Sequence, residues 1–359
     1  MKLMIVTGTR PEIIKLSPVI KECIYRGLDI TLVHSGQHYS YEMDRIFFEE
    51  LGLPEPDYNL EAGSGSHGCQ TASILCGIEK LMMEVNPDWV IVQGDTNTVL
   101  ASALAASKLH IKVAHVEAGC RSYNKLMPEE INRVLTDHIS DLLFVQSDEI
   151  RVILLGEGIK DEKIVVVGNT IVDAVIQNLE IANEKSGILE KTDLSPGKYG
   201  LLTLHRQENV DDPERFSRIL DGVGRVSERY GISFIYPVHP RSQKMIREHG
   251  IQVPDSIVRI EPVGFLDFLR LESTSYIVMT DSGGVQFEAC VLRVPCVTLR
   301  DETEIPETIA VGSNLVAGTD PVQILRASEK MVNVQKDWPN PFGDGDSGKK
   351  IIDRIMLES

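Results

Sequence analysis

Three glutamates lie around one loop in the stretch HVEAGCRSYNKLMPEEINR. The apolar VAHV run predicts a strand, and Glu117 follows it directly. Pro128 is suited to the first position of a helix, because its missing N–H would lack a partner there. Glu129 and Glu130 then fall in the first helical turn. Since ligands bind outside the carboxyl ends of parallel strands, this loop is a candidate site for proton transfer by carboxylates.

Each carboxylate also has a structural interpretation. Helix dipoles favour acids in a first turn, and at most one of Glu129 and Glu130 can face a site, because successive helix positions differ by about 100°. Glu130 and Arg133 stand three positions apart and could form an ion pair. Asp95 follows another apolar strand, in QGDTNT, where it could cap a helix. If Asp95 and Glu117 end neighbouring strands, however, they meet at one crevice, and nearby carboxylates can have their proton affinities pushed apart.

Two cations follow the first predicted strand. Arg10 lies in the turn GTRPE, which opens a helix, and Lys15 comes about one turn later. Helix starts attract anions, so both side chains could bind a phosphate. The pattern is not the G-x-G-x-x-G fingerprint, and pairing with surface carboxylates is an equal alternative.

Two histidines in the second half follow predicted strands, and each has a neighbouring arginine. His205 stands in TLHRQEN, and His239 stands in PVHPR. A phosphate or proton-transfer role is about as plausible as a structural one for the pair.

The clearest phosphate signal is DSGGVQFE, in which a strand runs into a helix that starts with two glycines. The backbone N–H groups of Ser282, Gly283 and Gly284 would face the crevice, and no Cβ on the glycines would keep phosphate oxygens away. Glu288 could bind a ribose diol. The alternative is an ordinary cap with glycines kept for packing. No G-x-x-x-x-G-K-[ST] motif is present, so ATP hydrolysis is not supported.

Short β-branched runs alternate with amphipathic stretches along the whole chain, which predicts parallel sheets covered by helices. The expected strands are 3–7, 29–33, 89–93, 113–116, 142–145, 163–167, 200–204, 233–237, 257–260, 276–280 and 296–299. The polar stretch 183–198 resembles a seam between two halves, and we expect two Rossmann-like domains, 1–168 and 169–345.

Bulk properties narrow the class of protein. A chain of 359 residues with net charge −17 is not expected to bind nucleic acid or an anionic membrane surface. Six scattered cysteines form neither a disulfide framework nor a zinc motif. No apolar run approaches the roughly 20 residues of a membrane span, and the N-terminus reads as a strand rather than a signal peptide. These features predict a cytoplasmic protein.

Taken together, the motifs resemble those of the non-hydrolysing UDP-N-acetylglucosamine 2-epimerases. The matching strings follow the family's order across about 300 residues: GTRPEIIK (8–15), GQH (36–38), GDTNT (94–98), HVEAG (115–119), PEEINR (128–133), HRQEN (205–209), PVHPR (237–241), DSGG (281–284) and RDETEIPE (300–307).

The resemblance implies a GT-B fold, in which two doubly wound parallel-sheet domains face a cleft and the C-terminal helix, residues 346–359, packs back on the first domain. It also implies a homodimer that uses no NAD, no other cofactor and no metal. Such enzymes eliminate UDP from UDP-N-acetylglucosamine, reprotonate C2 of the 2-acetamidoglucal intermediate on the other face, and add UDP back to give UDP-N-acetylmannosamine.

The family's roles transfer by position. Asp95, Glu117 and Glu130 become the acid/base candidates, with His205 beside them as a catalytic residue. The substrate-binding residues implied are Arg10, Lys15, His239, Phe268, Ser282, Gly283, Gly284 and Glu288, with Phe268 beside uracil and Glu288 on the ribose.

Two departures stand out. Ile305 replaces the arginine of the family's T-E-R-P-E loop, so another cation, for which Arg300 is a candidate, must substitute or the contact is absent. Cys69 and Gln207 replace arginines of the activating substrate site that many bacterial members have, which puts allosteric activation in question.

Three other functions fit parts of the pattern. A hydrolysing epimerase would release UDP and free N-acetylmannosamine with the same carboxylates. A GT-B glycosyltransferase would transfer the sugar without change at C2. A sensor of nucleotide sugars would bind without turnover, but it would gain nothing from three carboxylates beside an anionic ligand.

Overall fold

The computed structural model describes residues 1–37 and 41–358, with the side chains of 41–44 left aside. By their contacts, these residues form two compact units, 1–174 with 342–358 and 175–341. The chain passes from one to the other inside helix α7 (Thr170–Lys185). The polar stretch 183–198 is therefore not the seam: it belongs to the second unit, where Ile188 and Leu189 are buried in its core.

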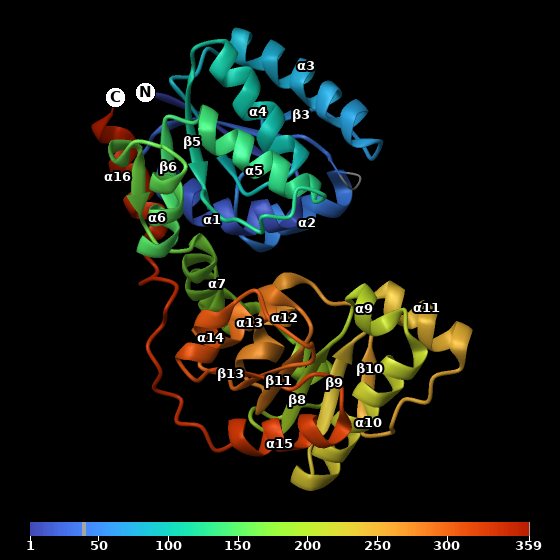
Figure 1. Cartoon of the computed structure of the whole chain (residues 1–359). Helices are drawn as coiled ribbons and strands as arrows, with labels where there is room; N and C mark the ends of the chain where they lie inside the picture. Colours follow the sequence, from blue (N-terminus) through green and yellow to red (C-terminus); the bar gives the residue numbers. More distant parts are fainter. Residues whose placement is uncertain (38–40, 359) are drawn as a thin grey trace. The chain divides into compact units, whose positions relative to one another are not determined.

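The first unit is built on a parallel sheet of seven strands in the order β3-β2-β1-β4-β5-β6-β7 (Figure 1). Its strands are β1 (Lys2–Thr7), β2 (Asp29–His34), β3 (Tyr58–Asn59), β4 (Trp89–Gln93), β5 (Lys112–Val116), β6 (Leu142–Val145) and β7 (Ile164–Val166). Its helices are α1 (Arg10–Tyr25), α2 (Tyr41–Glu50), α3 (His67–Val85), α4 (Asn97–Lys108), α5 (Pro128–Ile139), α6 (Asp148–Gly156), the 3₁₀ turn η1 (Asp161–Lys163) and α16 (Ser347–Leu357).

The second unit repeats the plan with six parallel strands in the order β10-β9-β8-β11-β12-β13. Its strands are β8 (Tyr199–Thr203), β9 (Ser233–Pro237), β10 (Ile257–Ile260), β11 (Ile277–Thr280), β12 (Cys296–Thr298) and β13 (Asn314–Val316). Its helices are α8 (Ile188–Lys191), α9 (Gln207–Val210), α10 (Pro213–Tyr230), α11 (Pro240–His249), α12 (Phe265–Ser273), α13 (Gly283–Val291), α14 (Pro306–Ala310) and α15 (Pro321–Met331).

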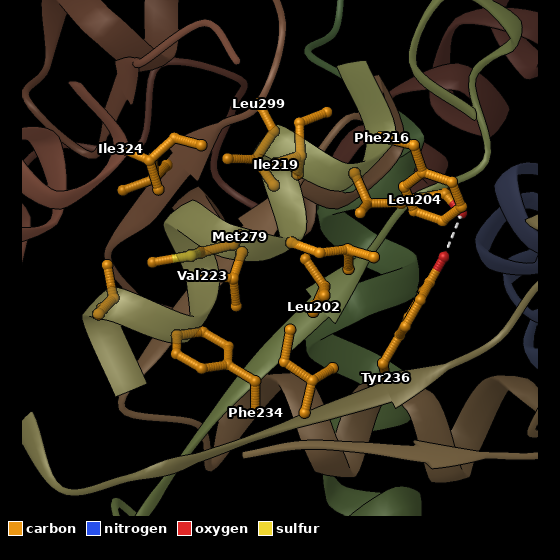
Figure 2. Packing of buried hydrophobic residues seen from close by; sticks show 14 of the residues in the cluster. Leu202, Leu204, Phe216, Ile219, Val223, Phe234, Tyr236, Met279, Leu299 and Ile324 are labelled. Atoms are coloured by element: carbon orange, nitrogen blue, oxygen red, sulfur yellow. Dashed lines mark hydrogen bonds between the residues drawn. The ribbon is translucent and has the colours of Figure 1, made fainter. Parts of the chain in front are cut away.

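Each unit has its own apolar core. In the second unit, Leu202, Phe234 and Met279 from the sheet pack against Phe216 and Val223 of α10, and all are fully buried (Figure 2). Burial of such side chains contributes roughly 1.5–3 kcal/mol each relative to exposure. The same figure shows the Tyr236 hydroxyl donating to the Leu204 carbonyl, 3.0 Å away, so that this polar group is not left unpaired in the core.

The last helix returns to the start of the chain. In Figure 1, α16 (red) lies beside α1 (blue) in the first unit. Gly348 sits against the backbone of Pro18, where a Cβ would come within 2.9 Å of the Pro18 carbonyl carbon. The Gly348 N–H donates to the Asp173 carboxylate at 2.8 Å, which fixes the start of α16.

The predicted doubly wound parallel sheets are confirmed, and all eleven expected strands lie within one residue of the observed ends. The strands β3 and β13 were not predicted. In neither sheet does the spatial order of the strands follow the chain. The strand order reverses between β1 and β4 in the first unit and between β8 and β11 in the second, while all strands stay parallel. These reversals are switch points, where open α/β sheets bind ligands. No helix in the described part of the chain is both long and apolar enough to cross a membrane.

Candidate active site

A pocket of about 330 Å³ opens at the switch point of the first unit. The loops after β1, β4 and β5, the first turns of α1 and one side chain of α5 surround it. Its lining residues are Thr9, Pro11, Glu12, Lys15, Gln93, Gly94, Asp95, Thr96, Glu117, Cys120 and Arg133. Two of the three predicted acid/base carboxylates are thus in one pocket with a lysine and an arginine.

Glu117 is the best-anchored carboxylate of this pocket. Lys15 Nζ lies 2.8 and 2.6 Å from its two oxygens, and Gln93 Nε2 donates to Oε2 at 2.5 Å. Burial disfavours the charge on Lys15, but the attraction of Glu117 outweighs it and raises the pKa of Lys15. Glu117 has φ +63, a left-handed conformation that costs a non-glycine residue free energy and is found mostly where function demands a particular orientation.

Asp95 is not a helix cap, since Thr96 caps α4 by accepting from Val99 N. Asp95 instead forms an ion pair with Arg133 of α5. Burial raises the pKa of Asp95; Arg133 opposes this and the nearby Glu117 adds to it. Two carboxylates of the pocket therefore have different surroundings: Glu117 is held by a lysine, whereas Asp95 takes up a proton more readily than a free aspartate.

Glu130 does not line the pocket but contacts Arg133, which does. Its carboxylate accepts from Ser122 N, Ser122 Oγ and Tyr123 N, all at 2.9 Å, and Arg133 Nη1 is 3.4 Å away. Burial raises the pKa of Glu130, but these hydrogen bonds outweigh it and the net pKa is lowered. Glu129 is exposed. In this structure Glu130 orders the 120–127 loop and supports Arg133; its catalytic role stays a prediction.

The backbone N–H groups before helix α1, beside the pocket, are bonded to a carboxylate of the chain itself. The Glu12 carboxylate accepts from Gly8 N (2.5 Å), Thr9 N (3.1 Å) and Thr96 Oγ1 (2.6 Å). Burial raises the pKa of Glu12 to about 7 against these hydrogen bonds. Sequence reasoning passed over Glu12, although T-x-x-E at 9–12 is the capping-box pattern that signals it.

Among the described residues, Arg10 and Lys15 make different contacts. Lys15 is engaged by Glu117, and the Arg10 guanidinium lies 5.0 Å from the centre of the Phe47 ring. Their predicted role at phosphates stays a prediction.

The switch point of the second unit is organised by Asp281, which is fully buried. Its carboxylate accepts from the backbone N–H groups of His205 and Arg206 and from Asn209 Nδ2, all within 3.2 Å. His205 Nδ1 lies 3.2 Å from the same carboxylate, and its ring is 5.7 Å from that of His239. Burial and the neighbouring His205 lower the pKa of His239. The two predicted histidines are thus brought together.

Helix α13 starts at Gly283, directly after β11 and Ser282. Within the described residues, no side chain caps this helix, and no acceptor is found for the N–H groups of Gly283 and Gly284. The Ser282 N–H is taken by Thr280 Oγ1 at 2.9 Å. Two backbone donors are therefore available to an anion at the position where the sequence predicted a diphosphate site.

Ile305 and Arg206 lie next to this helix start. A Cβ on Gly283 would be 3.5 Å from Ile305 Cδ1 and 4.0 Å from Arg206 Nη2. Arg300, the expected substitute for the family's arginine, is buried and bonded to Glu208 at 2.8 Å and Glu304 at 3.5 Å. Arg206, 3.7 Å from Glu304, is therefore the cation closer to the glycine turn. The sequence indicated it only as the arginine next to His205 and not as the substitute for the family's arginine.

Phe268 and Glu288 complete the predicted residues of the second unit. Phe268 of α12 is half-buried against the core, and Glu288 of α13 is half-buried. Glu288 contacts Glu272, whose carboxyl is fully buried; burial and the neighbouring acid raise its pKa well above the usual range. Cys69, one of the two departures from the family's activating site, is exposed. In the string GQH, Gln37 accepts from Thr98 Oγ1 at 2.6 Å, and His38 lies outside the described residues.

Comparisons with known proteins cover the whole chain. The sequence pattern that defines the family "UDP-N-acetylglucosamine 2-epimerase" matches residues 22–356. The UDP-N-acetylglucosamine 2-epimerase of Methanococcus maripaludis is 54% identical over 99% of both chains.

Solved structures agree with the sequence comparison. A UDP-GlcNAc 2-epimerase from Methanocaldococcus jannaschii is similar with a TM-score of 0.91, 51% identity and full coverage of both chains. A second structure of that enzyme, in complex with UDP-GlcNAc and UDP, matches with a TM-score of 0.86, 52% identity and the same coverage. The fold alone is shared with the calicheamicin glycosyltransferase CalG4, at 12% identity, a TM-score of 0.55 and coverage of 99% and 94% of the two chains.

Proposed function

The chain belongs to the UDP-N-acetylglucosamine 2-epimerase family, and we propose that it interconverts UDP-N-acetylglucosamine and UDP-N-acetylmannosamine without net hydrolysis. The observation that carries this proposal is the pocket that holds Asp95, Glu117 and Lys15 together. Epimerisation at C2 needs a base on one face of the sugar and an acid on the other, and two unlike carboxylates meet this need.

The proposed reaction has two stages. A carboxylate removes the proton from C2, the electron pair forms a C1–C2 double bond, and the C1–O bond to UDP breaks, which leaves 2-acetamidoglucal and UDP. A carboxyl group then protonates C2 from the opposite face while a UDP oxygen forms the new bond to C1. One proton and one UDP return, so the atoms balance and no water is consumed.

The surroundings of the carboxylates suit these stages. Lys15 and Gln93 stabilise Glu117 as an anion, which a base requires. The raised pKa of Asp95 makes this carboxyl readier to hold a proton than a free aspartate, which suits a group that exchanges the role of acid and base. In the reverse reaction, the two carboxyl groups exchange the roles of base and acid.

The second unit supplies the proposed diphosphate site. Negative charge grows on the departing UDP, and the open N–H groups of Gly283 and Gly284 and the helix dipole of α13 stabilise it. Arg206 adds a positive charge there, and His205, oriented by Asp281, is placed to hydrogen-bond the leaving phosphate. We assign Phe268 to the uracil, Glu288 to the ribose and His239 to the rim of this site.

We also propose a homodimer. Four large apolar side chains on α5 and the loop before it are exposed in the single chain: Tyr123 (72%), Leu126 (92%), Ile131 (48%) and Leu135 (48%). Clusters of this kind mark interaction surfaces. Sedimentation equilibrium should give the mass of two chains; the mass of one would contradict the dimer.

The experiment for the reaction is proton NMR of the purified protein with UDP-N-acetylglucosamine in D₂O, with no metal or NAD added. A UDP-linked manno sugar with deuterium at C2 in both epimers is expected. Free N-acetylmannosamine with UDP would indicate the hydrolysing enzyme, and a retained C2 proton with sugar transfer to an acceptor would indicate a glycosyltransferase.

A further inference from the structure

A fully buried histidine, which does not itself line the first-unit pocket, is bonded to a residue that does, Gly94. His115, in β5, has no exposed surface. Its Nδ1 is 2.7 Å from Asp137 Oδ1 of α5, and its Nε2 is 2.8 Å from the carbonyl oxygen of Gly94. The reaction proposed above does not use it.

Both neighbours of this ring are acceptors. The Gly94 carbonyl cannot donate a hydrogen bond. Burial raises the pKa of Asp137, but His115 and Arg121 outweigh it and the net pKa is lowered, so Asp137 is ionised and also accepts. Each ring nitrogen must therefore carry a hydrogen, which makes His115 an imidazolium ion.

Charged groups around His115 balance this cation. Arg121 Nη1 lies 2.7 Å from Asp137 Oδ2 and donates through Nη2 and Nε to Glu157, each at 2.7 Å. His138 Nε2 is 3.5 Å from Glu157. The buried pair His115–Asp137 thus continues as an alternating row of charges from β5 through α5 to the end of α6. A neutral ring would leave one buried acceptor without a hydrogen bond, which is unfavourable.

The row of charges joins the two turns that carry the pocket carboxylates. Gly94, bound by Nε2, directly precedes Asp95. Asp137 Oδ2 accepts from Gly119 N at 3.1 Å, two residues after Glu117. The Gly94 N–H also donates to the Val116 carbonyl oxygen at 3.1 Å, so the turn after β4 is bonded directly to the end of β5 as well.

We propose that His115 is a positioning residue, which as a buried imidazolium fixes the turns of Asp95 and Glu117 relative to each other. This inference rests on the proposed epimerase function for its kinetic consequence. Because reacting groups displaced by about 1 Å can lose roughly 100-fold in rate, loosening either turn affects the chemical step and leaves UDP binding to the second unit intact.

The first test needs no activity. Long-range ¹H–¹⁵N spectra of the wild-type protein labelled in histidine report which ring nitrogens carry hydrogens. Both ring nitrogens of His115, assigned by its absence in His115→Gln, should carry hydrogens, because each faces an acceptor. A His115 ring with one bare nitrogen at neutral pH would overturn the inference. If His115→Gln does not fold, each of the other eight histidines is replaced in turn, and the signal that persists in all eight variants is assigned to His115.

The second test separates positioning from stability. Glutamine can donate to Asp137 or to Gly94 but not to both, so His115→Gln should lower kcat about 10–100-fold, with KM and UDP affinity changed little. His110→Gln, in an exposed turn, is the matched control and should behave as wild type. If the wild type is active and His115→Gln has the same kcat, the positioning role is refuted. If the wild type shows no exchange at C2, the proposed function is refuted, and the NMR experiment alone then decides whether His115 is an imidazolium.

Discussion

Helices α1 and α13 both start at a switch point, but their N-termini are occupied differently. At α1, the Glu12 carboxylate accepts two backbone N–H groups, so the chain's own anion fills the place that a phosphate would take. At α13, the first two residues are glycines and, among the described residues, nothing accepts from their N–H groups. A strand–turn–helix pattern therefore does not by itself say where a phosphate binds; the third helical residue decides.

This difference suggests a division of labour between the units. The first unit concentrates the carboxyl groups of Asp95, Glu117 and Glu12 in one pocket, with Lys15 and Arg133 to balance their charge. The second unit offers fixed donors and the cation Arg206 at an open helix start. Proton transfer and stabilisation of departing UDP can then be broken separately, which the following predictions use.

The largest effect is expected from the pocket carboxylates. Asp95→Asn and Glu117→Gln remove an acid/base group and should each slow C2 exchange by about 10²–10⁴-fold, while UDP still binds. Solvent-exchange NMR and calorimetry with UDP measure the two quantities. Glu129→Gln, on the exposed side of α5, is the control. Exchange at the wild-type rate in both variants would remove this pocket from the chemistry.

Gly283→Ala should damage the other unit. The new Cβ meets Ile305 only at 3.5 Å, so the fold accepts it, but it crowds an anion at the helix start. Loss of a hydrogen bond to a charged phosphate predicts UDP binding weaker by about 10–100-fold, with unchanged thermal stability. Gly187→Ala, at the start of α8 with nothing near its Cβ position, should bind normally. Equal affinities in all three proteins would contradict the diphosphate site.

Glu12→Gln tests the closed helix start through the pH dependence of stability. The folded pKa of about 7 exceeds the model-compound value of 4.5, so the folded state binds this proton more tightly than the unfolded state. The resulting stabilisation is complete below pH 4.5 and is lost as the pH rises through 7. Between these limits the free energy of unfolding of wild type should fall by about 1–3 kcal/mol relative to Glu12→Gln. Denaturant titrations measure it, with the exposed Glu84→Gln as control; parallel curves would contradict the raised pKa.

Arg206→Lys should have the smallest effect. It keeps the charge and loses the planar fork, so UDP affinity should drop about twofold to tenfold. Arg300→Lys, at the buried arginine bonded to Glu208 and Glu304, provides the contrast and should change stability more than affinity. A larger loss of UDP affinity in Arg300→Lys than in Arg206→Lys would instead make Arg300 the substitute for the family arginine that Ile305 replaces.

Most of the fold could be predicted from the sequence. Central strands such as 89–93 are continuous apolar runs, because parallel strands are buried on both faces. The edge strands β3 and β13 escaped notice since they have two and three residues, too few to show a period. The stretch 183–198 was interpreted as the seam because a polar surface stretch resembles a linker. The units divide instead at 174/175, inside the regular helix α7 and near the predicted domain boundary at 168/169.

The candidate site was predicted as a set of residues but not as a network. Ion pairs across the fold, Lys15 with Glu117 and Asp95 with Arg133, depend on which strands become neighbours, and chain order does not reveal this. Glu12 was overlooked because a capping box is usually structural. His115 was overlooked because it stands inside a strand, where alternation predicts only that it is buried.

Hydrogen–deuterium exchange of the backbone amides with and without UDP tests the contrast between the two helix starts most directly. The amides of Gly283 and Gly284 should exchange quickly in the free protein and slow markedly with UDP. Those of Gly8 and Thr9, already bonded to Glu12, should exchange slowly in both states. Protection by UDP at residues 8–9 with none at 283–284 would contradict the account, because it would place the diphosphate on the first unit.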